Sequence, residues 1–158
     1  MSLPAPFHVS DRGDGKTYWV VGNTITTRAG GSDTAGAYTL FEILVPAGAG
    51  TPPHIHRNED EAFYVVEGEL AFVSDEQSAT VGAGGFIHAP RGVRHCYQAK
   101  TDVRMLVLAL PAGIEGYFEE VGHEVTADRP APEAPSEDDF RRLMEAAPGY
   151  GLEIFPPA

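Results

Sequence analysis

Four side chains able to bind a metal ion stand at spacings that would bring them together. His54 and His56 are two residues apart, so on a β-strand their imidazoles project from the same face. Glu61 stands at the expected start of the next strand, and His95 follows a turn at residues 90–93. Three neutral imidazoles and one carboxylate form a borderline-hard donor set, which suits one divalent transition-metal ion: Fe, Ni, Mn, Co, Cu or Zn. The residue types and spacing therefore favour a metal site.

Two features weigh against the interpretation of these residues as metal ligands. A single histidine in a β core is usually a hydrogen-bonded structural residue. A pair of histidines at i, i+2 raises the odds of a metal site only somewhat. Glu59 and Asp60 also offer competing carboxylates beside Glu61. Glu61 is preferred because its spacing to His56 and to Gly68 fits, and its two neighbours are expected in a solvated turn.

Short runs of alternating apolar residues must position these side chains. Eighteen glycines and thirteen prolines suit a chain that turns often. Gly68 permits positive φ in a tight hairpin, and the turn that begins at Pro90 aims His95 inward. The pattern predicts an all-β sandwich or barrel. The expected strands are 17–21, 24–28, 37–45, 61–66, 69–74, 78–81, 86–89, 95–98 and 103–110.

The chain changes character after residue 110. A short helix is expected over residues 113–121, followed by a proline-punctuated linker at 128–135. Ser136 is typical of an N-cap, with Asp139 in the third position of the helix, and Phe140, Leu143 and Met144 are expected on one face. The tail at 150–155 is apolar enough to dock. We expect a barrel at residues 1–112 and a helical extension at 113–158, within one domain overall.

The net charge and the cysteine content indicate which classes of partner and which cellular location to expect. The formal net charge is −12, which repels phosphate backbones and anionic lipids, so neither nucleic acid nor membrane is an expected partner. Cys96 is the single cysteine and rules out an internal disulfide. No secretion signal or membrane-spanning run is recognisable, and a cytoplasmic location is expected.

The residues around the four ligands resemble the two motifs of the cupin superfamily. The first motif is Gly, five residues, His-x-His, three or four residues, Glu, six residues, Gly, and every interval fits Gly48, His54, His56, Glu61 and Gly68. The second is Gly, five residues, Pro-x-Gly, two residues, His, three residues, Asn. It fits Gly84, Pro90, Gly92 and His95, with Ala99 in place of Asn and Gly85 in place of a frequent Asp. Neither departure falls on a ligand position.

This resemblance implies a cupin jelly-roll β-barrel, also called a double-stranded β-helix. Within the cupins, the chain looks most like microbial single-domain proteins grouped with quercetin 2,3-dioxygenases. The resemblance implies a dioxygenase for an enolisable, aromatic substrate, with dioxygen as co-substrate and Glu61 as the base that takes the substrate proton. It also implies a homodimer, formed through sheet faces or through swapped strands at residues 17–28.

Three further residues share parity with a ligand on their own strands: Phe63, Val65 and Tyr97. We expect them to line the same cavity and contact a substrate, although filling the barrel is an equal alternative. His88 is expected to be a packed or surface histidine. Two other functions remain open: a metal-dependent cyclase, isomerase or lyase that uses no oxygen, and a non-catalytic small-molecule binder.

Overall fold

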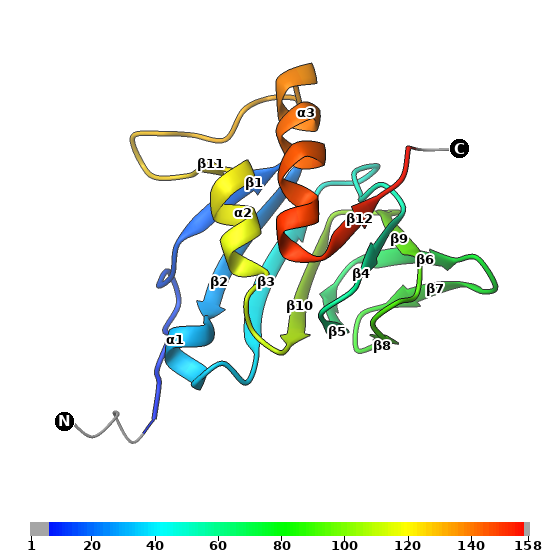
Figure 1. The fold of residues 1–158 in the computed structure, drawn as a ribbon, viewed down its shortest axis with the longest axis horizontal. Coiled ribbons are helices and arrows are strands. Elements are labelled where there is room, and N and C mark those ends of the chain that lie inside the picture. The colour runs from blue at the N-terminus through cyan, green and yellow to red at the C-terminus, as the bar shows by residue number, and fades with distance from the viewer. Residues whose placement is uncertain (1–6, 157–158) are drawn as a thin grey trace.

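Two sheets face each other, and helices cover the part of the larger sheet that the smaller one leaves free. The structure is a computed structural model that describes residues 7–156 (Figure 1). The strands are β1 (Thr17–Val20), β2 (Asn23–Ala29), β3 (Thr39–Val45), β4 (His54–His56), β5 (Asp60–Glu67), β6 (Glu69–Ser74), β7 (Ser78–Gly82), β8 (Phe86–Ala89), β9 (His95–Ala99), β10 (Val103–Leu110), β11 (His123–Glu124) and β12 (Leu152–Ile154). The helices are α1 (Gly31–Thr34), α2 (Glu115–Val121), α3 (Glu137–Ala146) and a 3-10 turn, η1 (Ala147–Tyr150).

The order of the strands is that of an antiparallel double sheet. Within residues 7–156, the seven-stranded sheet runs β11-β1-β2-β3-β10-β5-β8 and the five-stranded sheet runs β12-β4-β9-β6-β7. Consecutive strands β5 and β6 lie in different sheets, and β6 then pairs with β9. The predicted all-β fold with a short C-terminal helix is confirmed.

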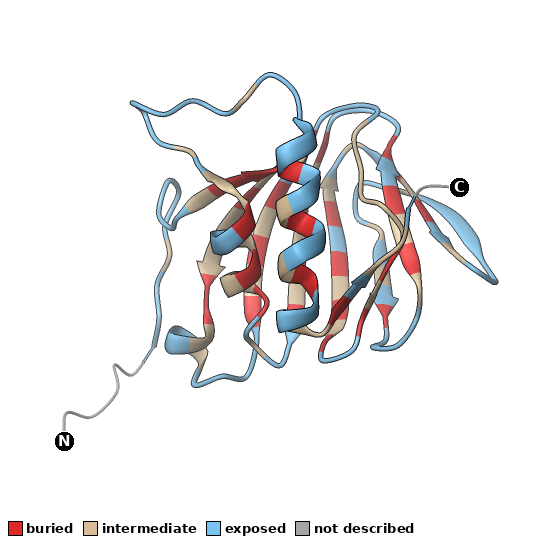
Figure 2. Ribbon diagram, turned by 45° about the horizontal axis from the view of Figure 1, so that its top comes forward, coloured by how far each residue is buried: buried red, intermediate tan, exposed pale blue. Residues whose placement is uncertain are grey.

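Alternating burial along the strands builds the core between the layers. On β3 the side chains of Phe41, Ile43 and Val45 are buried, and the residues between them are not. Strand β10 follows the same rule over its whole length, which gives the banded colouring of the central strands in Figure 2. This is the period of two that the sequence pattern requires of a half-buried strand.

The strand boundaries expected for residues 69–74, 86–89 and 103–110 match the observed β6, β8 and β10. Strand β3 begins two residues later than expected, after a turn at Gly36 with φ of 80°. Gly68 has the expected positive φ, 91°, but the predicted hairpin is wrong: the turn carries the chain from β5 in one sheet to β6 in the other, and the two strands do not pair.

Helices α2 and α3 pack against the seven-stranded sheet. Phe118 meets Phe41 edge to face, with ring centroids 5.2 Å apart, and the Tyr117 hydroxyl donates to the Leu143 carbonyl at 2.9 Å. The N-cap of α3 is confirmed, because the backbone N–H of Asp139 donates to the Ser136 hydroxyl and the Asp139 carboxylate accepts from the Ser136 N–H.

The buried face of α3 is not the one that was expected. Phe140 and Met144 are exposed, and the buried side chains are Asp139, Leu143 and Ala147, at i, i+4 spacing. Asp139 fixes this orientation, because its carboxylate binds both the N-cap and the His123 ring. A buried polar anchor thus outweighs the apolar pair in choosing the face.

The C-terminal segment also contributes strands that were not expected. Strand β11 pairs with β1, and β12 pairs with β4, with Leu152 opposite His56 and Ile154 opposite His54. The apolar tail therefore docks on the strand that carries two of the predicted ligands.

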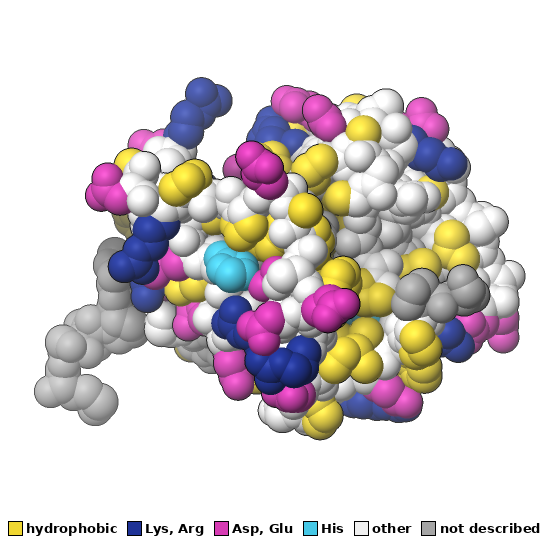
Figure 3. Space-filling model, turned by 90° about the horizontal axis from the view of Figure 1, so that it is seen from above, with side chains coloured by type: hydrophobic (Ala, Val, Ile, Leu, Met, Phe, Trp, Pro, Cys, Tyr) yellow, Lys and Arg dark blue, Asp and Glu magenta, His cyan; other side chains and the backbone are white. Residues whose placement is uncertain are grey.

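The surface carries scattered charges. On the face drawn in Figure 3, Lys and Arg side chains lie apart from one another and are interspersed with Asp and Glu. Among the described residues, no helix combines the length and apolar composition needed to cross a bilayer.

Candidate metal centre and cavity

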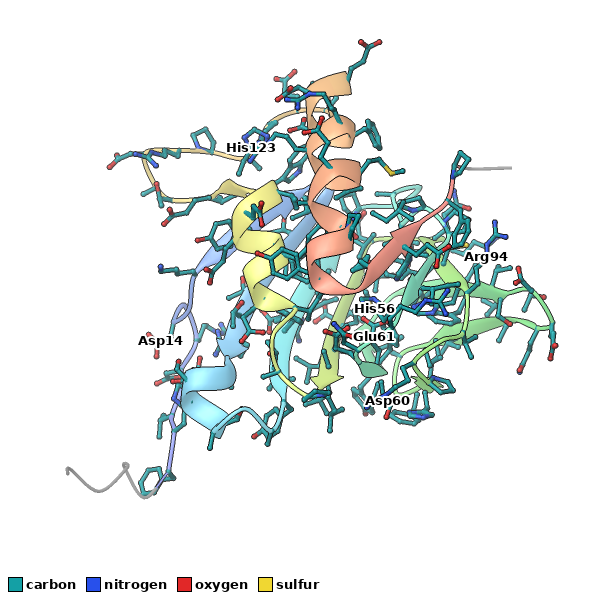
Figure 4. The ribbon with its side chains drawn as sticks, viewed as in Figure 1. Asp14, His56, Asp60, Glu61, Arg94 and His123 are labelled. Atoms are coloured by element: carbon teal, nitrogen blue, oxygen red, sulfur yellow. The ribbon has the colours of Figure 1, made fainter. Side chains whose placement is uncertain are left out.

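Three strands bring the four predicted ligands together. Strand β4 presents His54 and His56 from one face, β5 contributes Glu61, and β9 contributes His95, which is the register partner of His54. One ligand atom from each residue lies within 4.8 Å of the others, and all four residues are buried. Figure 4 labels His56 and Glu61 next to each other in the interior, with His123 far from them.

Two of the three imidazoles contact one carboxylate oxygen, and the third lies beside them. The Nε2 atom of His95 lies 3.0 Å from Oε2 of Glu61, and Nε2 of His56 lies 3.3 Å from the same oxygen. The rings of His54 and His95 have centroids 4.4 Å apart.

The hydrogen bonds of the Nδ1 atoms explain why Nε2 faces the centre in His54 and His95. Nδ1 of His54 lies 2.9 Å from the Pro52 carbonyl, and Nδ1 of His95 lies 3.1 Å from the Val93 carbonyl. A carbonyl only accepts, so Nδ1 carries a proton in both rings. In the neutral form of such a ring, the lone pair of Nε2 is directed inward.

A lone pair on His95 Nε2 directed at a carboxylate oxygen 3.0 Å away is repulsive unless a positive charge lies between them. A metal cation supplies that charge, and so does a proton. The set of three imidazole nitrogens and one carboxylate oxygen fits a divalent transition metal in both donor type and number.

Burial and neighbouring charges hold two of these groups in the protonation states that metal binding needs. Burial, with the charge of His56, lowers the pKa of His54 from 6.5 to about 4. Burial works to raise the pKa of Glu61, but the charge of His56 and the contact with His95 outweigh it and lower the pKa to about 2. His54 is therefore neutral and Glu61 ionised at neutral pH.

An apolar cavity opens beside the four ligands. Its volume is about 90 Å³, enough for several water molecules. It reaches from His54, His56 and Glu61 to the helices, where Phe118 and Leu143 complete the wall. The remaining lining comes from β1–β3 with the turn after β1, the loop before β4, and β5, β9, β10, α2 and β12. It is mostly aliphatic and aromatic: Val20, Val21, Asn23, Ile25, Phe41, Ile43, Thr51, Pro52, Phe63, Tyr97, Val107, Tyr117, Leu152 and Ile154.

Of the three residues expected to contact a substrate, Phe63 and Tyr97 line this cavity and Val65 lies elsewhere in the core. Val65 shares the inward face of β5 with Glu61, as parity requires. However, four residues of strand separate them, roughly 13 Å at 3.3 Å per residue, which takes Val65 beyond the cavity. Its side chain is fully buried against other core residues.

The phenol of Tyr97 already has a partner. Its hydroxyl donates to Oδ1 of Asn23 at 2.8 Å, and the Asn23 amide donates in turn to the carbonyls of Val20 and Gly50. Because the hydroxyl proton of Tyr97 is donated to Asn23, the hydroxyl oxygen can only accept a hydrogen bond from a group in the cavity. The role of Asn23 could not be predicted from the sequence, because Asn23 lies 74 residues from Tyr97 and belongs to no local motif.

Glu59 was also misjudged from the sequence. It is buried rather than solvated, and its carboxylate Oε2 lies 3.3 Å from Nδ1 of His56. The spacing of three residues across a turn was the available signal. Asp60, in contrast, is partly exposed and pairs with Arg91, and His88 is exposed as expected.

Comparison with known proteins agrees with this geometry. Residues 41–111 match the family model described as "Cupin domain", a stretch that includes all four predicted ligands. Residues 41–111 therefore resemble a cupin domain. The cupin jelly-roll expected from the motifs is therefore confirmed, together with the likeness to quercetin 2,3-dioxygenase described next.

One curated relative is quercetin 2,3-dioxygenase of Bacillus subtilis (strain 168), whose sequence is 24% identical to this chain over 126 residues. The match covers 79% of this chain but only 37% of the relative, so the chain spans about a third of that protein's length.

Solved cupin structures share the fold at low identity. An RmlC-like cupin from Shewanella frigidimarina NCIMB 400 has a TM-score of 0.62 and 21% identity, covering 72% of this chain and 99% of its own. KdgF from a Halomonas species has a TM-score of 0.59 and 21% identity, covering 70% of this chain and 98% of its own. These likenesses establish the architecture of the cupin domain.

Proposed function

We propose that this cupin is a metal-dependent enzyme acting on a small molecule, and specifically a quercetinase-like dioxygenase for an enolisable aromatic substrate. The observation that carries the proposal is the convergence of three inward-facing imidazole nitrogens on the Glu61 carboxylate at the wall of an apolar cavity. Similarity to quercetin 2,3-dioxygenase supports the choice of reaction.

In this proposal His54, His56, Glu61 and His95 hold one divalent transition-metal ion. When bound, the ion acts as a Lewis acid that stabilises negative charge on a substrate oxygen and, in a redox-active form, supports reaction with dioxygen. The protein contributes the neutral imidazole of His54 and the ionised carboxylate of Glu61, both already present before the metal binds.

Glu61 has a second role as the base. Its side chain lines the cavity as well as the metal centre, so it reaches both a ligand position and a substrate hydroxyl. Transfer of the hydroxyl proton to the Glu61 carboxylate leaves the substrate as an enolate.

The cavity wall favours a flat or aliphatic substrate body. Phe63 offers an aromatic surface to the cavity, and its ring lies 6.2 Å from that of His95. Tyr97, as an acceptor, would bind a hydroxyl or N–H group of the substrate. An aromatic molecule with one ionisable hydroxyl and a second hydrogen-bond donor satisfies both requirements.

Elemental analysis tests the metal site. Protein purified without a metal-chelating tag is expected to contain about one equivalent of a transition metal, and His54→Ala is expected to lose it. His88→Ala is the matched control, because His88 is exposed on β8 and should leave the metal content unchanged. Equal metal content in both variants would refute the ligand assignment.

Oxygen consumption tests the reaction. The metal-loaded protein is expected to consume dioxygen with a flavonol or a related enol, and Glu61→Gln should abolish this. Turnover of an enol or a hydroxy acid without oxygen uptake would instead indicate a cyclase, isomerase or lyase. Ligand binding by metal-free protein without any turnover would indicate a small-molecule binder.

We also propose that two chains associate through the outer face of the seven-stranded sheet. Leu44, Tyr64 and Phe86 are exposed there, and Tyr64 and Phe86 are direct register partners. Swapped N-terminal strands are not needed, because β1 already pairs with β2 and β11 of its own chain.

A further inference from the structure

Glu59 is a buried carboxylate with an unusual neighbour. Its side chain is 5% exposed, although it follows the exposed residues Arg57 and Asn58 in the turn between β4 and β5. Burying an ionised carboxylate is costly unless it is paired. Among the described residues, its one hydrogen-bond partner is Nδ1 of His56, at 3.3 Å.

The three predicted histidine ligands differ in how their outer nitrogen is held. His54 and His95 each bind the backbone carbonyl of the residue two positions earlier. His56 binds a carboxylate instead. A carbonyl fixes the orientation and tautomer of an imidazole, whereas a carboxylate also increases the electron density on the ring and so strengthens the opposite nitrogen as a ligand.

The position of His56 explains why a side chain is used there. Its Nε2 is 3.3 Å from Glu61, so the ring lies between two carboxylates, one at each nitrogen. Glu59 receives the outer N–H, and this leaves the inner lone pair directed toward the centre. Without Glu59, the ring could turn over and donate directly to Glu61, which would close the site to a metal.

We propose that Glu59 is a positioning residue that holds the His56 ring in its metal-binding orientation and strengthens its Nε2 as a ligand. The inference rests on the metal site of the proposed function. It assigns Glu59 no contact with substrate, and it predicts that affinity for the metal depends on a residue that does not touch the ion.

Titration of metal-free protein with Co(II), followed by its visible absorption, tests this role. Glu59→Leu keeps a buried side chain of similar size and removes the acceptor, and it should weaken Co(II) binding about 10-fold or more and change the absorption spectrum. Glu59→Gln keeps an acceptor oxygen and should recover part of the loss. If Glu59→Leu fails to fold, Glu59→Gln, with weaker binding than wild type, carries the test.

Asp60→Asn is the matched control. Asp60 is the next carboxylate along the chain and pairs with Arg91 rather than with a histidine, so its loss should leave the Co(II) affinity and spectrum unchanged. Folded Glu59 variants that bind Co(II) within twofold of wild type, with the same spectrum, would overturn the inference. Wild-type protein that binds no Co(II) would instead overturn the proposed function, so the two failures are distinguishable.

Discussion

Each imidazole of the centre is oriented by a bond on the side away from the centre. Pro52, Val93 and Glu59 receive the Nδ1 protons, and Nε2 is left to face Glu61. These bonds belong to the protein alone, so the centre is arranged before any ion arrives. Little side-chain ordering then opposes metal binding, which favours affinity.

The low pKa of His54 predicts a pH-dependent stability of the metal-free protein. Because the pKa of His54 is about 4 in the folded protein and 6.5 for an exposed histidine, the unfolded chain binds a proton at His54 between these pH values and the folded protein does not. The free energy of unfolding should therefore fall as the pH drops from about 6.5 to about 4. The His54 contribution to this fall is about 3 kcal/mol.

Urea unfolding at several pH values measures this effect in wild type and His54→Gln. Since the pKa of His56 is raised and acts in the opposite direction, the comparison between the two proteins isolates the His54 contribution. Parallel pH profiles of the two proteins would contradict the prediction.

The bond between Tyr97 and Asn23 predicts a second measurable cost. Tyr97→Phe leaves Oδ1 of the buried Asn23 without its donor, which should lower the free energy of unfolding by about 1–3 kcal/mol. Tyr38→Phe removes a hydroxyl from an exposed ring and should cost almost nothing. Chemical unfolding of both variants decides the point, and equal stabilities would show that the bond contributes little.

The ligand residues were predictable, and their supporting partners were not. His54, His56, Glu61 and His95 follow from a period of two and from motif spacing, which are local in sequence. Asn23 meets Tyr97 only through tertiary packing, and Glu59 looked like a turn residue because burial cannot be read from composition.

At the scale of elements, short turns keep the ligand strands in register. The chain passes from β5 in one sheet to β6 in the other at Gly68, where φ is 91° and an added Cβ would collide with the backbone carbonyl of Asp102. Both a strained conformation and a rigid obstacle therefore oppose any other residue.

Comparison of two glycines separates these effects. Gly36→Ala meets positive φ but open space, and it should cost about 1–2 kcal/mol of unfolding free energy. Gly68→Ala adds the collision with Asp102 and should cost clearly more. Thermal or urea unfolding measures both, and similar losses would mean that the turn between β5 and β6 relaxes around the new methyl group.

Strand boundaries were predictable from alternation, but strand partners were less so. The alternation of β10 marks a strand wherever it pairs, whereas nothing local to Leu152–Ile154 indicates that it pairs with His54–His56, almost a hundred residues earlier. The buried face of α3 was likewise decided by Asp139 and its partners rather than by Phe140.

At the scale of the whole molecule, the outer sheet face predicts self-association. Analytical ultracentrifugation should give about twice the 16.9 kDa mass of one chain. Replacing both Tyr64 and Phe86 with Glu should give the monomer, because charges would be buried in an apolar contact. Met144→Glu, on an exposed position of α3, is the control and should remain dimeric. A monomeric wild type would remove the proposal.

The two ends of the cavity differ in polarity. The imidazoles and the carboxylate belong to β4 and β5, whereas the side chains of Phe118 and Leu143 form the wall on the helices. An elongated molecule with one polar head fits such a space in a single direction. Inserted backwards, it would leave its head against hydrocarbon and its tail against a carboxylate, with a penalty at both positions. In the proposed reaction, this difference between the two ends of the cavity places only one end of the substrate beside Glu61.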